Sequence, residues 1–222
     1  MLIKTPNKNF KEYFYPCLGG ILGGISVSTH FWLIFMPFSI FILWNGSEKR
    51  IANFCWGFFF ILISHSWIYD LHPLTWMGFS WLASLIITIS ILLFCSVIGG
   101  ILVLLWGLLG EIILFKEDIF KMKFLPLSIK VLLLSITWGI GELILSQTSF
   151  FWIGIGESLV PGDMYLAGLS RWIGSSGLCV VQIIIGFWIH LIHGRWKRKA
   201  HFKKTFIFGL LFIAFLHLFG AL

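Results

Sequence analysis

Residues 79–109 read FSWLASLIITISILLFCSVIGGILVLLWGLL and contain no charged side chain. A helix needs about 20 consecutive apolar residues to cross the roughly 30 Å of hydrocarbon in a bilayer. This run exceeds that length without a break. It therefore predicts a transmembrane helix and favours an all-α, polytopic integral membrane protein over a water-soluble fold.

The composition of the whole chain agrees with this interpretation. Of its 222 residues, 59% are hydrophobic and 11% are charged, and the mean hydropathy is +0.97. Soluble domains typically carry about 25% charged residues, and a soluble fold of this length could not cover so much apolar surface. The twelve tryptophans are predicted to anchor at the two membrane interfaces.

The formal net charge of +7 would suit a nucleic-acid-binding protein. Its cations, however, form short clusters between apolar runs. Such clusters set the orientation of a membrane protein and contact anionic lipid headgroups. The charge pattern therefore indicates a membrane partner and no nucleic acid.

The apolar runs predict seven helices within one transmembrane domain, residues 1–222. The first run, 14–44, is too long for one ordinary helix and contains paired glycines, the polar triplet 28–30 and Pro37. We therefore divide it at a turn near residues 29–31. The predicted helices cover residues 14–29, 31–44, 51–70, 79–109, 125–145, 172–192 and 205–222.

Lysine and arginine residues predict the orientation, because they gather on the cytoplasmic side of a membrane protein. If the N-terminus is on the cytoplasmic side, seven crossings place four clusters of cations on that side as well. These clusters are Lys4–Lys11, Lys49–Arg50, Lys116–Lys130 and Arg195–Lys204. Arg171 is then the single Lys or Arg residue of the outer segments, and the C-terminus lies outside. The outer segment 146–170 is too apolar for a solvated loop and is interrupted by Gly and Pro. We predict that it is interfacial or re-entrant.

Glu142 is the most conspicuous ionisable residue inside an apolar run, where a charge costs roughly 2.5–3.5 kcal/mol at the membrane centre. It follows Trp138 by four residues, so the two side chains share a helix face. Two interpretations stay open from the sequence. Glu142 either faces a cavity that holds a substrate or positions the outer segment, or it is a structural carboxyl bonded to a neighbouring helix.

Histidines and cysteines offer no clear reactive site. His30, His65 and His72 could be imagined as ligands of a haem or a metal, but their spacing does not require it, and no metal or cofactor is predicted. The four cysteines show neither a CxxC spacing nor an outer-face His or Glu partner that the sequence would indicate. They are predicted to be packing residues, and no catalytic residue is predicted.

Several short motifs, in order along the chain, resemble the bacterial apolipoprotein N-acyltransferases. They are Phe54–Gly57, Trp67–Tyr69 with Leu71–His72, Trp138 with Glu142–Leu143, Phe150–Trp152, Gly156–Ser158, and Leu169–Val180 with its glycines. The sequences HPLTWMG, residues 72–78, and LVPGD, residues 159–163, are similar to those of cyanobacterial members. The chain departs from the family pattern at Leu145, Phe151 and Glu157, where Arg, Pro and Tyr are usual.

The resemblance implies an inner-membrane enzyme that moves an acyl chain from a phospholipid to the amino-terminal cysteine of a lipoprotein. Family members have eight helices, with a nitrilase-like domain between the seventh and eighth that supplies a Glu-Lys-Cys catalytic set. We expect that domain to be absent from this chain. The chain would then be a membrane half, truncated or encoded apart from a nitrilase-like catalytic subunit, and inactive alone.

We expect this membrane half to bind phospholipid and lipoprotein acyl chains at the outer leaflet. The residues expected to line the lipid-access site are Trp67, Tyr69, His72, Trp138, Glu142 and Trp152. The alternative is a non-catalytic lipid-binding or transporter-like membrane protein.

Overall fold

The computed structural model describes residues 8–29, 32–148, 152–198 and 202–222, and these residues form helices joined by short turns. The long helices are α1 (Lys8–Ser28), α2 (Trp32–Gly46), α3 (Arg50–Ser64), α4 (Trp81–Ile113), α5 (Phe124–Ser146), α8 (Ser170–Lys197) and α9 (Phe202–Ala221). The short helices are η1 (Ser66–Leu71), η2 (Leu74–Met77), η3 (Ile155–Ser158), α6 (Leu159–Gly162) and α7 (Met164–Ala167).

Four of these helices, α4, α5, α8 and α9, are long and apolar enough to cross a membrane, and Phe35–Gly46 and Arg50–Ser64 are shorter apolar helices. The prediction of an all-α, polytopic membrane protein is therefore confirmed. The number of crossings and their orientation stay predictions. The turn predicted near residues 29–31, together with His30, falls mostly outside the described residues.

Several predicted helix ends differ from the structure: α1 begins at Lys8 instead of residue 14, and α4 ends at Ile113 instead of residue 109. Two further differences have an identifiable cause. The helix expected over residues 51–70 ends as an α-helix at Ser64 and continues as the 3₁₀ helix η1, because apolar composition does not distinguish the two backbones. The helix expected over 172–192 runs from Ser170 to Lys197 and includes a kink at Gly174, whose φ of +69° favours glycine.

Glycines set the close packing of the first helices. A methyl group added at Gly20 of α1 would meet the backbone of Trp56 and, at 2.9 Å, the amide nitrogen of Phe60 on α3. One added at Gly57 of α3 would meet the carbonyl oxygen of Gly99 on α4. Small residues of this kind allow helix backbones to approach where lipid supplies no hydrophobic drive. Gly20, Gly57 and Gly99 therefore lie at backbone-to-backbone contacts of α1, α3 and α4.

Four tryptophans form the centre of the bundle, and each is at most 3% exposed. The rings of Trp44 and Trp106 are 5.0 Å apart, those of Trp106 and Trp138 5.4 Å, and those of Trp138 and Trp56 5.9 Å. Each indole N–H donates a hydrogen bond of 2.6–3.1 Å, to Ile183, Ser39, Leu134 or Glu142. The prediction that the tryptophans anchor at the interfaces is thus wrong for these four, because protein acceptors satisfy their N–H groups inside the bundle, three of them on a neighbouring helix and one, Glu142, on the same helix as Trp138.

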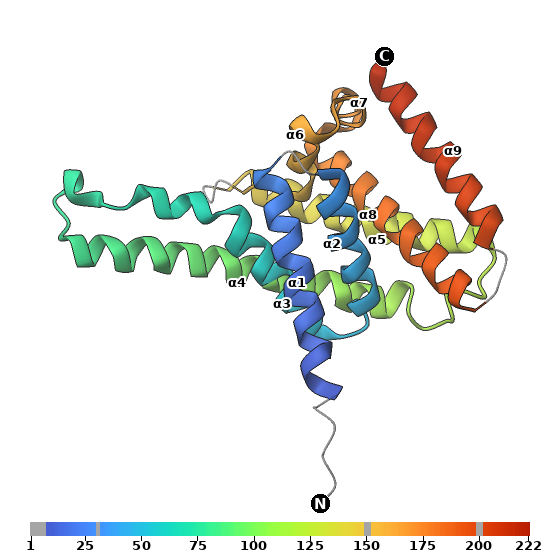
Figure 1. Ribbon diagram of the computed structural model, residues 1–222, viewed down its shortest axis with the longest axis horizontal. Helices are drawn as coiled ribbons and strands as arrows, with labels where there is room; N and C mark the ends of the chain where they lie inside the picture. The colour runs from blue at the N-terminus through green and yellow to red at the C-terminus, as the bar shows by residue number, and fades with distance from the viewer. Residues whose placement is uncertain (1–7, 30–31, 149–151, 199–201) are drawn as a thin grey trace, which may run out of the picture.

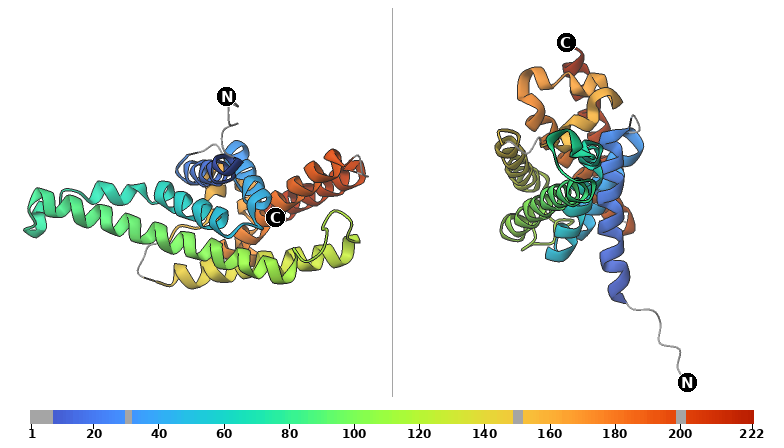
Figure 2. Two further views of the ribbon diagram at one scale, coloured as in Figure 1. Left: turned by 90° about the horizontal axis from the view of Figure 1, so that it is seen from below. Right: turned by 90° about the vertical axis from the view of Figure 1, so that its left-hand side faces the viewer.

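The helices are arranged around this centre with two projections (Figure 1). The hairpin of α3, η1, η2 and α4 extends to one side, and α9 diverges from α8 toward the C-terminus. The left-hand view of Figure 2 shows from a second direction that the hairpin extends well beyond the rest of the molecule. The segment with α6 and α7 lies near the C-terminal end of α9 (Figure 1).

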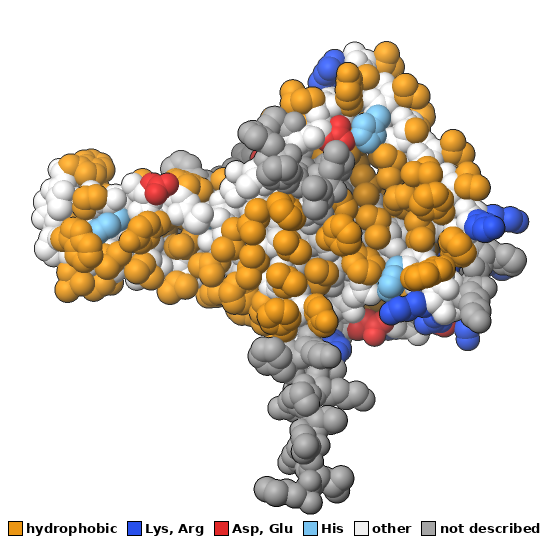
Figure 3. Space-filling view, viewed as in Figure 1, with side chains coloured by type: hydrophobic (Ala, Val, Ile, Leu, Met, Phe, Trp, Pro, Cys, Tyr) orange, Lys and Arg blue, Asp and Glu red, His pale blue; other side chains and the backbone are white. Residues whose placement is uncertain are grey.

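The end with the α4–α5 and α8–α9 connections carries most cations on the face shown in Figure 3. Several are paired there: Arg50 with Glu111 at 3.0 Å, Lys130 with Glu117 at 2.8 Å and Arg198 with Asp118 at 2.7 Å. The Arg198 guanidinium bonded to Asp118 lowers the pKa of that carboxyl. The cations thus gather at one end, and the side of the membrane that this end faces stays a prediction.

Candidate functional site

Glu142 lies one turn before the end of α5 and is only 4% exposed. The indole N–H of Trp138, one turn earlier on the same face, donates to Glu142 Oε1 at 2.6 Å. The backbone N–H of Ile155 donates to the same oxygen at 3.2 Å. The carboxyl group thus joins α5 to the outer segment.

Cys179 of α8 completes the surroundings of this carboxyl group. Its thiol donates to Glu142 Oε2, and the N–H of Gly156 donates to Cys179 Sγ at 3.2 Å. The sequence indicates no Glu partner for any cysteine, and the structure supplies one for Cys179. The partner comes from the packing of α5 on α8, where Gly139 faces Ser176 and Val180. A separation of 37 residues carries no signal of such a contact.

The outer segment is fixed at Ile155 through both of its backbone polar groups. The Ile155 carbonyl accepts from Gln182 Nε2 of α8 at 2.6 Å and from Ser158 Oγ at 2.6 Å. Ile155, Ser158 and Leu159 are at most 1% exposed. A methyl group added at Gly154 would collide with the Glu142 carboxylate. We refer to Trp138, Glu142, Ile155 and Cys179 as the carboxyl junction.

A second attachment of the outer segment involves the end of α3. The N–H of Ile153 donates to His65 Nε2 at 3.4 Å, while His65 Nδ1 lies 2.9 Å from Ser64 Oγ. This arrangement requires an imidazole with an unprotonated Nε2. The His65 ring also lies 5.7 Å from the Trp152 ring, so Trp152 borders this attachment. The predicted residues Phe150 and Phe151 lie outside the described residues.

Trp67, Tyr69 and His72 lie elsewhere, on the projecting hairpin. His72 Nδ1 is 2.8 Å from Ser84 Oγ of α4, and its ring packs edge-on against Trp81 at 4.9 Å. Trp67 and Tyr69 are 37% and 51% exposed. The six predicted residues thus form two groups, one exposed on the hairpin and one buried near the carboxyl junction.

The described residues contain no group of three His, Cys, Asp or Glu side chains that could hold a metal ion. His65 and His72 bond to different neighbours, Ile153 and Ser84. His30 lies outside the described part of the chain.

The outer segment is also tied to α9 by Asp163. Its Oδ1 accepts from the N–H of Leu166 at 3.0 Å, and its Oδ2 accepts from His217 Nε2 of α9 at 2.8 Å. Beside this contact, Gly168 and Gly220 bring the two backbones together. The outer segment therefore contacts α3, α5, α8 and α9.

We expect Asp163→Ala to lower the thermal midpoint of the purified protein by roughly 2–8 °C. The substitution removes the cap of α7 and the His217 contact, together worth about 1–2 kcal/mol, and 1 kcal/mol corresponds to about 2–4 °C in a chain of this size. Asp163→Asn keeps an acceptor for the N–H of Leu166, so its thermal midpoint should fall less than that of Asp163→Ala. Equal midpoints for the Ala variant and the wild type would contradict this assignment.

Comparison with known proteins shows which proteins this chain resembles in sequence. No protein-family model matches the chain. It is 69% identical over 221 residues to the apolipoprotein N-acyltransferase of Prochlorococcus marinus subsp. pastoris, covering 100% of the chain and 45% of that protein. It is 38% identical to the protein of the same name from a second Prochlorococcus marinus strain, covering 99% of the chain and 44% of that protein.

A third relative, the apolipoprotein N-acyltransferase of Parasynechococcus marenigrum, is 36% identical over 205 residues, with 92% of the chain and 41% of that protein covered. The chain thus spans a little under half the length of the curated relatives that it matches, in their N-terminal part. Over the length that it covers, this chain belongs to the apolipoprotein N-acyltransferase family.

Proposed function

We propose that the chain forms the membrane half of an apolipoprotein N-acyltransferase of the bacterial inner membrane. In this role it binds the acyl chains of the phospholipid donor and of the lipoprotein acceptor and presents them at the outer leaflet. The observation that carries the proposal is the projecting hairpin, whose tip exposes Trp67, Tyr69, Trp76 and Trp81 by 37–78%. Exposed aromatic side chains of this kind suit the lipid interface.

The carboxyl junction has a positioning role in this proposal. Both carboxylate oxygens of Glu142 accept hydrogen bonds from protein donors, Oε1 from Trp138 and Ile155 and Oε2 from Cys179. A carboxyl group held in this way suits the fixing of the outer segment better than the contact with a substrate. The acyl-transfer chemistry itself is assigned to a nitrilase-like part, carried by a longer chain or by a separate subunit.

The test is a chimaera in which this chain replaces the matching N-terminal part of the Prochlorococcus marinus subsp. pastoris relative. Mass spectrometry of a diacylated lipoprotein peptide then measures N-acylation. We expect the chimaera to acylate the peptide and the isolated 222-residue chain to leave it unchanged. An inactive but folded chimaera would contradict the proposal, and turnover by the isolated chain would contradict the assignment of the chemistry to another part.

In the same chimaera, we expect the double substitution Trp67→Ala and Tyr69→Ala to slow acyl transfer by about tenfold. Removing two partly exposed rings from an apolar contact costs about 1–2 kcal/mol of lipid binding, and 1.4 kcal/mol corresponds to a factor of ten. The thermal midpoint should change little, because neither ring is buried. Phe208→Ala on α9 is a matched control, since its ring is 52% exposed on another helix.

A further inference from the structure

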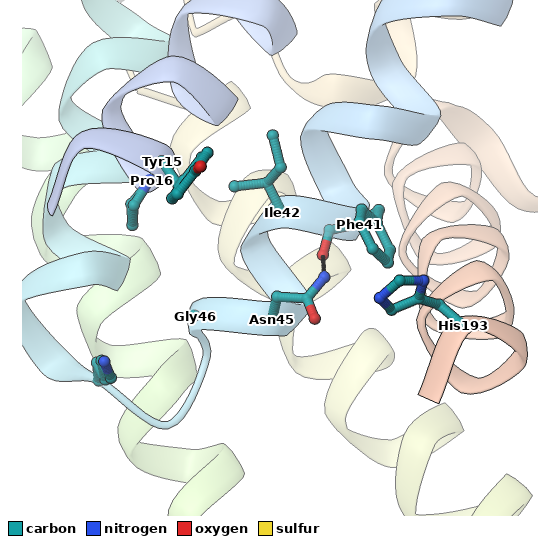
Figure 4. Close-up of a pocket in the computed structure, with 8 residues that line it drawn as sticks. Tyr15, Pro16, Phe41, Ile42, Asn45, Gly46 and His193 are labelled. Carbon is teal, nitrogen blue, oxygen red and sulfur yellow. Dashed lines mark hydrogen bonds between the residues drawn. The ribbon is translucent and has the colours of Figure 1, made fainter. Parts of the chain in front are cut away.

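Two cavities among the described helices differ in their lining. The smaller, of about 300 Å³, opens between α1, α2 and α8, and polar side chains such as Asn45 and His193 line it (Figure 4). The larger, of about 410 Å³, lies between α5, α8 and α9. Its fifteen lining residues include no charged side chain and only three that carry a polar side-chain atom, Ser128, Trp188 and Thr205. We refer to this larger space as the apolar cavity.

The three polar side chains of the apolar cavity are already hydrogen-bonded to the protein. Ser128 Oγ donates to the Phe124 carbonyl at 2.9 Å, and Trp188 Nε1 donates to the Thr205 carbonyl at 2.9 Å. The Thr205 hydroxyl accepts from Arg195 Nη1. A buried water needs about two to four polar partners, which this lining does not offer. The ligand that suits the lining is therefore hydrocarbon.

The apolar cavity extends from one end of the bundle toward its middle. On α9 the lining runs from Thr205, in the first turns of the helix, to Ile213. Eight residues of α-helix correspond to roughly 12 Å, most of the roughly 15 Å depth of one leaflet. Empty space is unfavourable in a packed bundle, because the atoms that line it lose van der Waals contacts. An acyl chain from one leaflet would restore those contacts along the cavity.

A positive charge lies at the mouth of the apolar cavity. The Arg195 guanidinium that bonds to Thr205 is half-buried there. Within the described part of the chain no carboxylate pairs with Arg195, whereas Arg50, Lys130 and Arg198 each bond to an acidic side chain. A guanidinium carries several N–H donors in a geometry that matches a phosphate group. Arg195 can therefore hold an anionic group at the mouth while it keeps its bond to Thr205.

The surroundings of the mouth favour the same ligand. Lys203 and Lys204 directly precede Thr205 in α9, and both are exposed. This is the end at which the cations gather (Figure 3), the cytoplasmic end in the predicted orientation. Basic pockets between transmembrane helices on that side bind the headgroups of anionic lipids.

We propose that the apolar cavity holds one acyl chain of an anionic phospholipid, whose phosphate group lies at Arg195. The lipid belongs to the leaflet at the cationic end and fills the space between α5, α8 and α9. It is retained as part of the bundle and is not consumed. It is therefore distinct from the acyl substrates of the proposed function, which are presented at the other leaflet.

The headgroup is tested by native mass spectrometry of the purified chain with phosphatidylglycerol or with phosphatidylcholine of the same acyl composition. We expect about fivefold tighter binding of phosphatidylglycerol, as one arginine near the phosphate would give. Arg195→Gln should remove this preference, and Arg195→Lys should keep most of it. Lys197→Gln is the matched control, because Lys197 is exposed at the same end but does not line the cavity. It should keep the preference.

The acyl chain is tested by filling the cavity. Ser128→Phe places a ring inside it, so binding of both lipids should fall about tenfold, since the ring takes the place of a few methylene groups of the chain. Ile129→Phe is the matched control, because Ile129 is 50% exposed and does not line the cavity. It should bind both lipids as the wild type does. The Arg195 variants add no volume, so they test the proposal even if Ser128→Phe fails to fold.

Four outcomes would overturn the proposal. The wild type could show no preference, or Lys197→Gln could lose it as fully as Arg195→Gln, which would indicate general surface attraction. Folded Ser128→Phe and Ile129→Phe could bind lipid equally, or excess inorganic phosphate could release the lipid, which would indicate a site for a free anion. The readout is lipid binding and not acyl transfer. Failure here would therefore leave the proposed function untouched, and an inactive chimaera would leave this site untouched.

Discussion

Glu142→Ala should lower the thermal midpoint of the purified protein by about 6–12 °C. The substitution leaves the buried N–H groups of Trp138 and Ile155 and the thiol of Cys179 without an acceptor. Each unsatisfied buried polar group costs about 1–3 kcal/mol, so a total near 3 kcal/mol is expected. At about 2–4 °C per kcal/mol for a chain of this size, that loss gives the stated shift.

The matched variant is Glu142→Gln, which keeps an oxygen acceptor for Trp138 and Ile155. Its thermal midpoint should fall by about a third as much as that of Glu142→Ala. A second readout is the labelling of Cys179 by a maleimide in a background in which Cys17, Cys55 and Cys95 are replaced by Ala. Cys179 is 1% exposed and should be unreactive in the wild type, and it should become reactive in Glu142→Ala. Unchanged labelling and equal midpoints for Ala and Gln would show that the carboxyl group does not hold the outer segment.

Of the single methyl groups that can be added to the α3–α4 hairpin, the one added by Gly57→Ala should destabilise the protein most. The new carbon would meet the Gly99 carbonyl oxygen and lie 2.6 Å from Val103 Cγ2. Because the first of these is backbone, the two helices must separate, and overpacking of this kind costs about 1–3 kcal/mol. We expect a loss of stability near the upper end of this range and therefore a thermal midpoint lower by about 6–12 °C.

Gly46→Ala is the control for this substitution, since its new carbon would lie 3.4 Å from Ala52 Cβ and 3.7 Å from Pro16 Cγ. Those distances are ordinary van der Waals contacts, so the midpoint should stay within a few degrees of the wild type. Light scattering alongside the thermal scan would reveal aggregation of separated helices. Equal behaviour of the two alanine variants would contradict the close approach of α3 and α4.

The membrane class of the fold could be predicted from the sequence because it depends on run length and composition, both of which residues 79–109 display directly. The pairing of Trp138 with Glu142 could also be predicted, because it is local to one helix and follows from a spacing of four residues. The family could be inferred from short motifs, and the comparisons bear it out.

The rest depends on contacts between distant helices. The bond from Cys179 to Glu142 requires the mutual rotation of α5 and α8, which apolar periodicity inside a membrane does not report. The separation of Trp67, Tyr69 and His72 from the carboxyl junction follows from the lateral course of the hairpin, which helix lengths do not encode (Figure 1). The end of α3 at Ser64 was missed because an apolar run suits a 3₁₀ backbone as well as an α-helix.

The four central tryptophans have an optical consequence. Their indole rings lie 5.0–5.9 Å apart in a continuous series from Trp44 to Trp56, and each is at most 3% exposed. Rings this close exchange excitation energy and couple their electronic transitions. The protein should therefore emit at short wavelength, with low polarisation, and show a strong near-ultraviolet circular dichroism signal. Loss of that signal would report separation of α2, α3, α4 and α5 before any helix unwinds.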